Sequence, residues 1–322
     1  MRQAAQWMPT ASLTHLKLRA ELLKKLRAFF EARSVLEVET PALSHAAATD
    51  RHLASFRVGN PHGGFLYLHT SPEFPMKRLL AAGSGDIWQL CKTFRAGEAG
   101  RLHNPEFTMI EWYRLGFDHL RLMREVAELI RSLVPTVQES PEYLTYRDAF
   151  RQHAGFDPFR ADRQICIQAL RDSGKTVPAA SALDDDGWLD MVAGEIVYPA
   201  LGRGHLTFVY DYPASQSALA RIRPDDPPVA ERFEAFLDGV ELANGFHELA
   251  DADEQRRRFE TDYSYRRTHG LSDMPMDENL IAALEHGLPE CAGVALGFDR
   301  VVMLAAGTRS IEEVIGFPFE RA

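Results

Sequence analysis

An arginine followed by a glycine-containing polar loop is the first feature of this sequence that suggests chemistry. Arg95 closes one apolar run, and residues 97–105 separate it from a second apolar run at 107–113. Two such runs around a polar loop predict a β-hairpin. The guanidinium of Arg95 could bind phosphate oxygens as a fork, and the ring of Phe107 could stack on a base. Hairpins with an arginine and a loop are also common as plain structure, so the pattern alone leaves both interpretations open.

Two acidic residues form the second feature. Glu241 and Glu248 are seven positions apart, so a regular strand would place their side chains on opposite faces. Asn244 and Gly245 lie between them and favour a turn or bulge, which would let both carboxylates converge. Converging carboxylates suit Mg²⁺, which prefers one or two of them together with substrate phosphates. The alternative is a pair of solvated acids on a hairpin.

A strand with little side-chain bulk forms the third feature. Gly293 and Gly297 would let a ligand approach the backbone closely, and Arg300 at the start of an apolar helix could bind an anion. Asp299 and Arg300 could instead form a surface ion pair. Taken together, the three features provide two arginines, two acids and an open strand. These are the groups needed to activate a carboxylate with a nucleoside triphosphate.

Two elements near the N-terminus would support these features. Residues 13–30 are predicted to form a helix, with Ser12 or Thr14 as its cap. The charged residues of this helix are expected to form a solvated face, with a specific basic docking surface as the alternative; they are Lys17, Arg19, Glu21, Lys24, Lys25 and Arg27. Residues 35–41 alternate apolar and acidic side chains and predict a strand that ends at Pro41. The apolar stripe of the helix is predicted to comprise Leu16, Ala20, Leu23, Leu26 and Phe30.

The remaining elements alternate irregularly. We expect a helix at 118–134, an insertion of mixed character at 135–201, and a strand at 206–212. A loop at 224–228 precedes a predicted short helix at 231–238, and a last helix is expected at 301–306. Strands interrupted irregularly by helices favour an α+β fold with a mainly antiparallel β-sheet flanked by helices.

Composition limits the classes of protein that fit. The chain has 322 residues, 45% apolar and 25% charged, which is ordinary for a globular protein. No apolar run reaches the roughly 18–20 residues of a membrane span, and no secretory signal is visible. The net charge of −10 disfavours general nucleic-acid binding. Three distant cysteines, Cys91, Cys166 and Cys291, predict free thiols in a cytoplasmic protein.

Read together, these segments resemble class II aminoacyl-tRNA synthetases of the lysine, aspartate and asparagine subgroup. Residues 36–41 resemble the family's motif 1, residues 94–111 its motif 2, and residues 293–300 its motif 3. The resemblance implies a class II catalytic core and a homodimer built through motif 1. Segments that resemble lysyl-tRNA synthetases in particular are 71–74, 77–79, 207–213 and 241–249.

The expected domain organisation is one catalytic domain over residues 1–322, because only about a dozen residues precede the first predicted helix. An anticodon-binding OB-fold is therefore not expected. The sequence resembles stand-alone paralogues of lysyl-tRNA synthetases that attach a lysine-like amino acid to a lysine of translation elongation factor P. This implies an ATP-dependent ligase that forms an adenylate of (R)-β-lysine or lysine, without tRNA binding. Two alternatives are a lysine–tRNA ligase and an inactive paralogue that senses amino acids.

The resemblance also implies roles at matching positions. Arg95 and Arg300 are the expected catalytic residues, holding the α-phosphate with the reacting carboxylate and the γ-phosphate respectively. Asn104 and Phe107 would frame the adenine, and Mg²⁺ would be bound by Glu241 and Glu248. The full set expected to contact ATP is Arg95, Ala96, Gly97, Asn104, Phe107, Glu241, Leu242, Gly297 and Arg300.

The amino acid is expected to bind near the start of another predicted helix. Glu73 would meet its backbone-type amino group, and Tyr113 would approach its side-chain ammonium. The set expected to contact the amino acid is Ser71, Pro72, Glu73, Tyr113, Glu248 and Ala295.

The sequence departs from the family pattern at three places. Motif 2 has glycine at 97 where the family has glutamate, and the acid follows at Glu98. Ala250 replaces an asparagine, which removes a polar contact expected for an α-amino acid. Ala295 replaces a glycine. Its methyl group predicts a preference for β-lysine over α-lysine, because a β-amino group lies one carbon further along and avoids the clash.

Overall fold

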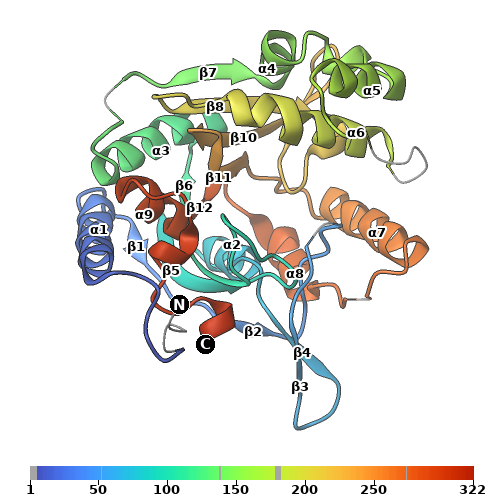
Figure 1. The fold of residues 1–322 in the computed structure, drawn as a ribbon. Coiled ribbons are helices and arrows are strands. Elements are labelled where there is room, and N and C mark those ends of the chain that lie inside the picture. The colour runs from blue at the N-terminus through green and yellow to red at the C-terminus, as the bar shows by residue number, and fades with distance from the viewer. Residues whose placement is uncertain (1–5, 52, 138, 178–182, 273) are drawn as a thin grey trace. The chain divides into compact units, whose positions relative to one another are not determined.

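The computed structural model describes residues 6–51, 53–137, 139–177, 183–272 and 274–322 (Figure 1). The chain divides into two compact units. The first contains residues up to 117, residues 132–135 and residues 250–322. The second contains residues 118–131 and 136–249. Each unit is described by itself below.

The first unit is built on a four-stranded sheet in the order β1-β5-β6-β12. In this sheet β1 is parallel to β5, whereas β6 is antiparallel to both of its neighbours, β5 and β12. A separate three-stranded sheet has the order β2-β4-β3. The elements are α1 (Leu13–Glu31), β1 (Leu36–Glu37), β2 (Leu43–Ser44), β3 (Arg57–Gly59), β4 (Phe65–Leu68), α2 (Glu73–Ala81), β5 (Ile87–Phe94), β6 (Glu106–Leu115), α7 (Ala252–Thr268), α8 (Glu278–Gly287), β12 (Cys291–Gly297) and α9 (Phe298–Ala305).

The predicted hairpin around the polar loop is confirmed as β5 and β6, which pair from Phe94 opposite Glu106. The structure also confirms the first helix and its cap, because the Ser12 hydroxyl accepts a hydrogen bond from the backbone N–H of His15. In Figure 1 this helix, α1, lies beside β1 and α9. The ring of Phe30 stacks on Trp88 of β5 with centroids 4.6 Å apart, which anchors the helix to the sheet.

The predicted apolar stripe of α1 is only partly correct. Its buried residues are Leu22, Leu26, Phe29 and Phe30, whereas Ala20 is exposed. Leu26 and Phe30 are already covered within a single chain. These two side chains therefore cannot contact a second protomer. The predicted homodimer would have to form through exposed residues instead. Leu36 of β1 is 54% exposed and remains available.

The second unit has its strands in the order β11-β10-β8-β7, with β9 also pairing with β10. Strand β7 is parallel to β8, and the other pairings are antiparallel. With the first unit, this confirms the predicted α+β class and the mainly antiparallel pairing. The elements of the second unit are α3 (His119–Leu133, of which 132–133 belong to the first unit), β7 (Glu142–Thr145), α4 (Tyr146–His153), α5 (Arg163–Asp172), α6 (Asp185–Val192), β8 (Thr207–Pro213), β9 (Ile222–Arg223), β10 (Val229–Leu237) and β11 (Val240–His247).

The short helix predicted at 231–238 is wrong, because residues 231–237 lie in strand β10 and Asp238 begins the turn that follows it. Their composition favours a helix, but β10 pairs with β8 on one side and β11 on the other. Both faces of the strand are buried along most of its length, so no alternation of apolar and polar residues reveals it. Pairing and burial on both sides override the local propensity.

The turn predicted at Asn244 and Gly245 is also wrong. Both residues lie inside β11, opposite Glu234 and Phe233 of β10. The chain instead reverses at Asp238 and Gly239, which both have positive φ angles of 51° and 73°. Positive φ at two successive residues is the geometry of the common two-residue hairpin turn.

The described residues of the segment predicted as an insertion, 135–201, contribute β7, the α-helices α4, α5 and α6, and short turns of other helix types to the second unit. Trp188 of α6 and Phe150 of α4 are fully buried in its core beside Tyr212 of β8. Part of the segment, residues 138 and 178–182, lies outside the described residues. The three cysteines are free thiols, as predicted. In the part of the chain that the structure describes, no helix is both long enough and apolar enough to span a membrane.

Candidate active site

A buried carboxylate lies at the centre of the first unit's sheet. Glu111 of β6 is 2% exposed, and each of its oxygens accepts a short hydrogen bond. The Ser71 hydroxyl donates to one oxygen and the Tyr113 hydroxyl to the other, both at 2.6 Å. Tyr113 lies two residues from Glu111, so both side chains are on the same face of β6. Two of the predicted amino-acid contacts, Ser71 and Tyr113, therefore converge on a third residue that the prediction did not include.

Ala295 of β12 lies directly opposite Glu111 in the antiparallel pairing of β12 with β6. Opposed residues share a face, with Cβ atoms about 4.5–5.5 Å apart. Gln89 of β5 occupies the same row on the other side of Glu111. The methyl group that distinguishes this chain from the family pattern is thus a direct neighbour of the buried carboxylate.

Glu73 is the first residue of α2, and its backbone N–H donates to the Ser71 hydroxyl at 3.0 Å. Ser71 therefore links the start of this helix to Glu111. The Glu73 carboxylate accepts a hydrogen bond from Lys77 Nζ at 2.7 Å, and the Lys77 side chain is 2% exposed. A substrate amino group at Glu73 would share this carboxylate with a buried ammonium.

Arg95 lies just beyond the end of β5, where its backbone N–H bonds to Pro105 O and closes the hairpin loop. Its guanidinium lies over the ring of Phe107, 5.1 Å from the centroid. Arg95 Nε is buried and makes no hydrogen bond with any described residue. An orphaned, buried guanidinium N–H is suited to an incoming anion. Arg95 and Phe107 thus lie together, as the phosphate-and-base interpretation requires.

Glu98 lies close to Arg95, with its carboxylate 3.8 Å from Arg95 Nη1. The chain reaches this position through Gly97, whose φ of +85° is in the region that favours glycine. A glycine at 97 therefore brings the acid of the next position back toward the arginine. This geometry is compatible with Glu98 replacing the glutamate that the family pattern has at 97.

Asn104 is buried, and its side-chain amide is occupied within the protein. Its Nδ2 donates to Glu106 O at 2.6 Å, and its Oδ1 accepts from the backbone N–H of Phe319 at 2.9 Å. These bonds connect the hairpin loop to the C-terminal segment. A contact of this side chain with adenine stays a prediction, and the bonds give Asn104 a structural role in addition.

Arg300 lies in the first turn of α9. Its Nε donates to Leu102 O at 3.3 Å, and its Nη2 lies 2.8 Å from His103 Nε2. The guanidinium is therefore held against the loop that follows Arg95. The neighbouring Asp299 is not part of a surface pair with Arg300, because it is 1% exposed and bonds elsewhere.

Asp299 accepts hydrogen bonds from two other elements. The backbone N–H of Thr108 in β6 donates to one oxygen at 2.6 Å, and the guanidinium of Arg19 in α1 donates to the other. Arg19 also donates to the Thr108 hydroxyl at 2.7 Å. The expectation of a solvated face is therefore wrong for Arg19, whose side chain is 19% exposed and paired with a buried carboxylate. Arg19 fixes the turn that carries Arg300.

The second unit carries the two predicted metal-binding acids. Strand β11 has a bulge, because Ala235 and Phe236 of β10 oppose Ala243 and Glu241, which leaves Leu242 as an extra residue. One extra residue reverses the alternation of side chains that follow it. Glu241 and Glu248, seven positions apart, are thereby brought to the same face. The bulge lies at Leu242 rather than at the predicted Asn244 and Gly245.

A buried polar network lies on that same face of the strands. Arg232 of β10 donates to Glu234 and to Asn244 Oδ1, the latter at 3.3 Å, and its guanidinium lies 4.5 Å from the ring centroid of Tyr212. Burial raises the pKa of Glu234 to about 7 against the opposing effect of Arg232, and the charge of Glu241 raises it further. Glu241 therefore lies close to a second carboxyl group. Such a set of oxygen donors is suited to Mg²⁺.

The predicted phosphate ligands belong to two units. Arg95 and Arg300 belong to the first, and Glu241 and Glu248 belong to the second. Their convergence on one nucleotide stays a prediction.

The sequence analysis missed two residues of the site. Glu111 lies in motif 2 but has no separate sequence signal, and Arg19 lies in a run of charged residues. Cys91 is unsuited to act as a nucleophile, because burial and, to a smaller extent, the charge of Glu111 raise the pKa of its thiol to about 12.

Comparison with known proteins gives a consistent result. A family model described as tRNA synthetases class II (D, K and N) matches residues 4–321. A protein of Vibrio cholerae named elongation factor P–(R)-β-lysine ligase is 51% identical over 99% of both chains. Proteins of the same name from Pseudoalteromonas translucida and Pectobacterium carotovorum are 51% and 49% identical, over 98% and 100% of both chains respectively.

Proposed function

Because the chain belongs to the class II tRNA synthetases (D, K and N), we propose that it is an ATP-dependent ligase for translation elongation factor P. Its relatives of about 50% identity carry that activity in their names and match over nearly their full length. In the proposed reaction, (R)-β-lysine or lysine is activated as an adenylate. The activated acyl group is then transferred to a lysine side chain of elongation factor P.

The observation that carries this proposal is the bonding of Glu111. A carboxylate buried in a sheet, with hydroxyls from Ser71 and Tyr113 bonded to its two oxygens, offers a fixed negative charge in a low-dielectric place. Such a group favours a ligand that brings a positive charge. The side-chain ammonium of a lysine-like substrate supplies that charge. We therefore assign Glu111, with Tyr113, to recognition of this ammonium.

The first step forms a bond between the substrate carboxylate oxygen and the α-phosphorus of ATP, and pyrophosphate leaves. Arg95 is proposed to hold the α-phosphate and the attacking carboxylate in line, which lowers the entropic part of the barrier. Arg300 is proposed to hold the γ-phosphate, and Phe107 the adenine. Mg²⁺, bound by Glu241 and Glu248, would neutralise charge on the triphosphate.

In the second step the neutral amine of the acceptor lysine attacks the carbonyl carbon of the adenylate. An amide bond forms, the bond to phosphate breaks, and AMP leaves together with one proton. No covalent bond to the protein is needed in either step. The proposed setting is the cytoplasm, where the acceptor protein works. We further propose a homodimer that uses the exposed surface around β1, including Leu36.

The test is ATP–pyrophosphate exchange with (R)-β-lysine and with α-lysine, followed by transfer to purified elongation factor P monitored by intact mass. Exchange and a mass increase of one lysyl group are expected. The variant Glu111→Gln keeps one accepting oxygen, replaces the other with a donating NH₂ group and removes the charge. It should raise the KM for the amino acid while changing the KM for ATP much less. Charging of tRNA in place of elongation factor P would support a lysine–tRNA ligase, and the absence of exchange would support an amino-acid sensor.

A further inference from the structure

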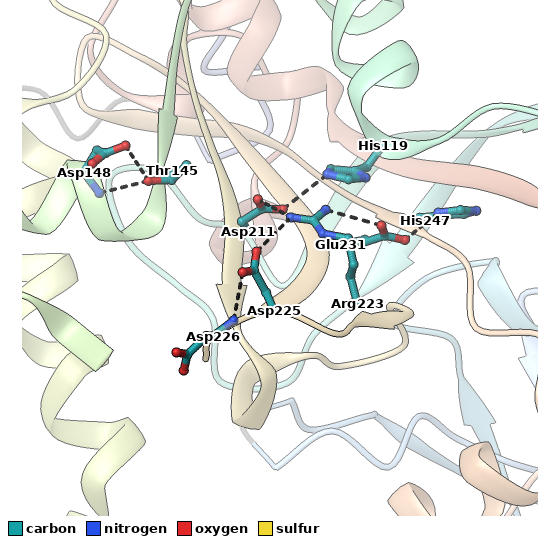
Figure 2. Close-up of polar contacts among 9 residues, drawn as sticks. All are labelled: His119, Thr145, Asp148, Asp211, Arg223, Asp225, Asp226, Glu231 and His247. Atoms are coloured by element: carbon teal, nitrogen blue, oxygen red, sulfur yellow. Dashed lines mark hydrogen bonds and ion pairs between the residues drawn. The ribbon is translucent and has the colours of Figure 1, made fainter. Parts of the chain in front are cut away.

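Three side chains of types that bind metal ions converge within the second unit. They are separate from the proposed Mg²⁺ ligands Glu241 and Glu248. They are His119, the first residue of α3, Glu231 of β10 and His247 of β11 (Figure 2). One potential ligand atom from each lies within 4.8 Å of the others, and all three side chains are buried. Two imidazoles and one carboxylate are a common donor set for zinc.

The cluster lies on the face of the strands opposite to Glu241 and Glu248. Arg232 opposes Phe246 in the pairing of β10 with β11, so Glu231 and His247, the next residues along the two strands, point to the other side. The cluster therefore does not belong to the proposed Mg²⁺ and ATP site. Its occupation can be measured separately from amino-acid activation.

His119 is the member whose environment points to a ligand. It is 2% exposed, and neither of its ring nitrogens makes a hydrogen bond with any residue that the structure describes. Its closest ionic neighbour is Asp211, with Oδ1 3.4 Å from Nε2, and that oxygen is also buried without a hydrogen bond. An imidazole buried in this way loses its hydrogen bonds to water and gains none from the protein. Burying it therefore costs folding free energy unless a ligand binds to it.

Asp211 reaches His119 through an unusual backbone conformation. Its φ is +59°, in the left-handed region, and the pairing of β8 with β10 is irregular at this point. Histidines that bind a metal through one nitrogen almost always donate the other N–H to a carboxylate or a carbonyl. Asp211 is placed to accept that N–H, as Figure 2 shows.

Glu231 and His247 are already bonded to each other. Glu231 Oε2 and His247 Nδ1 are 2.6 Å apart and are joined by one hydrogen bond. Both side chains are thus held in place, and displacement of one proton frees two ligand atoms.

Two arginines complete the surroundings. Arg223 lies 2.7 Å from Asp211 Oδ2 and 3.4 Å from Glu231 Oε1, and Arg221 lies 3.9 Å from Glu231 Oε2. Both guanidinium groups would repel a bound cation. Their side chains are 35% and 55% exposed, so solvent screens this repulsion. The two carboxylates balance these charges, and a divalent ion would rely chiefly on the two imidazoles.

We propose that His119, Glu231 and His247 bind a divalent metal ion of the zinc type, with Asp211 orienting His119 as its outer carboxylate. A water molecule would complete four-coordinate geometry. Such an ion would join α3, β10 and β11, and β11 leads directly into Glu248. The proposed role is structural: the ion fixes the end of the strand that precedes the acidic residue.

The test measures metal binding directly. The full chain is treated with a chelator, dialysed, and titrated with ZnCl₂ against a chromophoric competitor in the presence of excess Mg²⁺. Wild type should bind one zinc ion per chain, and Co²⁺ should give the visible absorption of a four-coordinate site. Asp211→Asn should weaken binding by about 10–100-fold, the usual effect of losing an outer partner. His119→Ala and Glu231→Gln should weaken it further.

The matched control is His286→Ala, which removes an exposed histidine of α8 and should leave zinc binding unchanged. The melting temperature of every chelated variant is measured, so that a loss of binding is not confused with unfolding. If His119→Ala is unfolded, His119→Gln replaces it. The proposal is wrong if the wild type binds no zinc, or if folded position-119 variants bind it as tightly as the wild type.

Discussion

The guanidinium of Arg19, in the first helix, donates a hydrogen bond to the buried carboxylate of Asp299, the residue before Arg300. The same guanidinium lies 5.0 Å from the ring centroid of Phe298 and bonds to Thr108 of β6. Three elements, α1, β6 and α9, are therefore connected at one point. The predicted γ-phosphate ligand is positioned by a residue that lies about 280 positions away in the sequence.

We predict that Arg19→Ala destabilises the chain by about 3–5 kcal/mol, because it leaves the buried Asp299 carboxylate without its cation. The matched control is Arg27→Ala on the same helix. Arg27 pairs with Glu37 at 3.2 Å, but the two side chains are 55% and 43% exposed. An exposed pair of this kind contributes about 0–1 kcal/mol. Urea unfolding of both variants measures the difference, and equal effects would contradict a positioning role for Arg19.

The second prediction concerns Arg95. Arg95→Ala should lower ATP–pyrophosphate exchange on the order of 10²–10³-fold, the usual effect of removing one electrostatic donor from a transition state. The fold should persist, since among the described residues the Arg95 side chain forms a distant ion pair with Glu98 and a ring contact with Phe107, and neither is a strong structural bond. Lys92→Ala is the control, because Lys92 lies on the same hairpin and is half-exposed. Near-normal exchange in Arg95→Ala would exclude this residue from the active site.

The third prediction concerns pH. Burial raises the pKa of Glu234 to about 7 in the folded chain, above its ordinary value of 4.5. Between these two values the folded chain keeps a proton that the unfolded chain has lost, so the free energy of unfolding should fall as pH rises. The loss amounts to on the order of 3 kcal/mol across this interval.

Glu234→Gln should remove this part of the pH dependence, because an amide does not titrate. Urea unfolding is measured for wild type and variant from pH 4.5 to 8. The free energy of unfolding of wild type should fall relative to that of the variant as pH rises, and the difference should become constant above about pH 7. The exposed residue Glu285 provides the control variant, Glu285→Gln. A wild-type curve parallel to that of Glu234→Gln would show that Glu234 is ionised throughout.

The sequence predicts best where local pattern and local structure agree. The hairpin of β5 and β6 has two apolar strands around a polar loop, and it is found at the expected residues. The strand β10 is missed because Glu, Arg and Ala favour a helix, and the pairing partners that make it a strand are distant in sequence or follow only after the turn at Asp238. Burial on both faces leaves no period of two to detect.

The site is predicted less completely than the fold because its geometry depends on register. The bulge at Leu242, which brings Glu241 and Glu248 to one face, follows from the pairing with β10 and has no signature in composition. The sequence around Arg19 does not distinguish it from the solvated residues of its helix, because its contact with Phe298 is made only by the packing of α9 against α1. Glu111 gains significance only when Ser71, 40 positions earlier, bonds to it. Each of these relationships is made by tertiary contacts.

The last prediction concerns the choice between β-lysine and α-lysine, and it rests on the proposed function. Ala295 opposes Glu111 across β12 and β6. The Ser71 hydroxyl bonds both to Glu111 and to the backbone N–H of Glu73, the residue expected to meet the substrate's other amino group. The methyl group of Ala295 is therefore proposed to lie within reach of that amino group. A methyl group in a close-fitting site typically costs a poorly fitting ligand about 1–3 kcal/mol, which is about a 10–200-fold discrimination. A substrate whose amino group lies one carbon further along can avoid that methyl group.

Ala295→Gly should therefore shift the ratio of kcat/KM values toward α-lysine, chiefly by improving activation of α-lysine. Exchange is measured with both isomers in wild type and in the variant, and melting curves confirm that β12 tolerates the additional glycine. The control is Ala292→Gly on the same strand, which opposes Arg114 rather than Glu111 and should leave the ratio unchanged. If Ala295→Gly has the same ratio as wild type, the methyl group does not select the substrate. The selectivity would then have to come from another residue of the pocket. Ala250 is the next position to change, because the resemblance implies an asparagine at 250 that could bond to an α-amino acid.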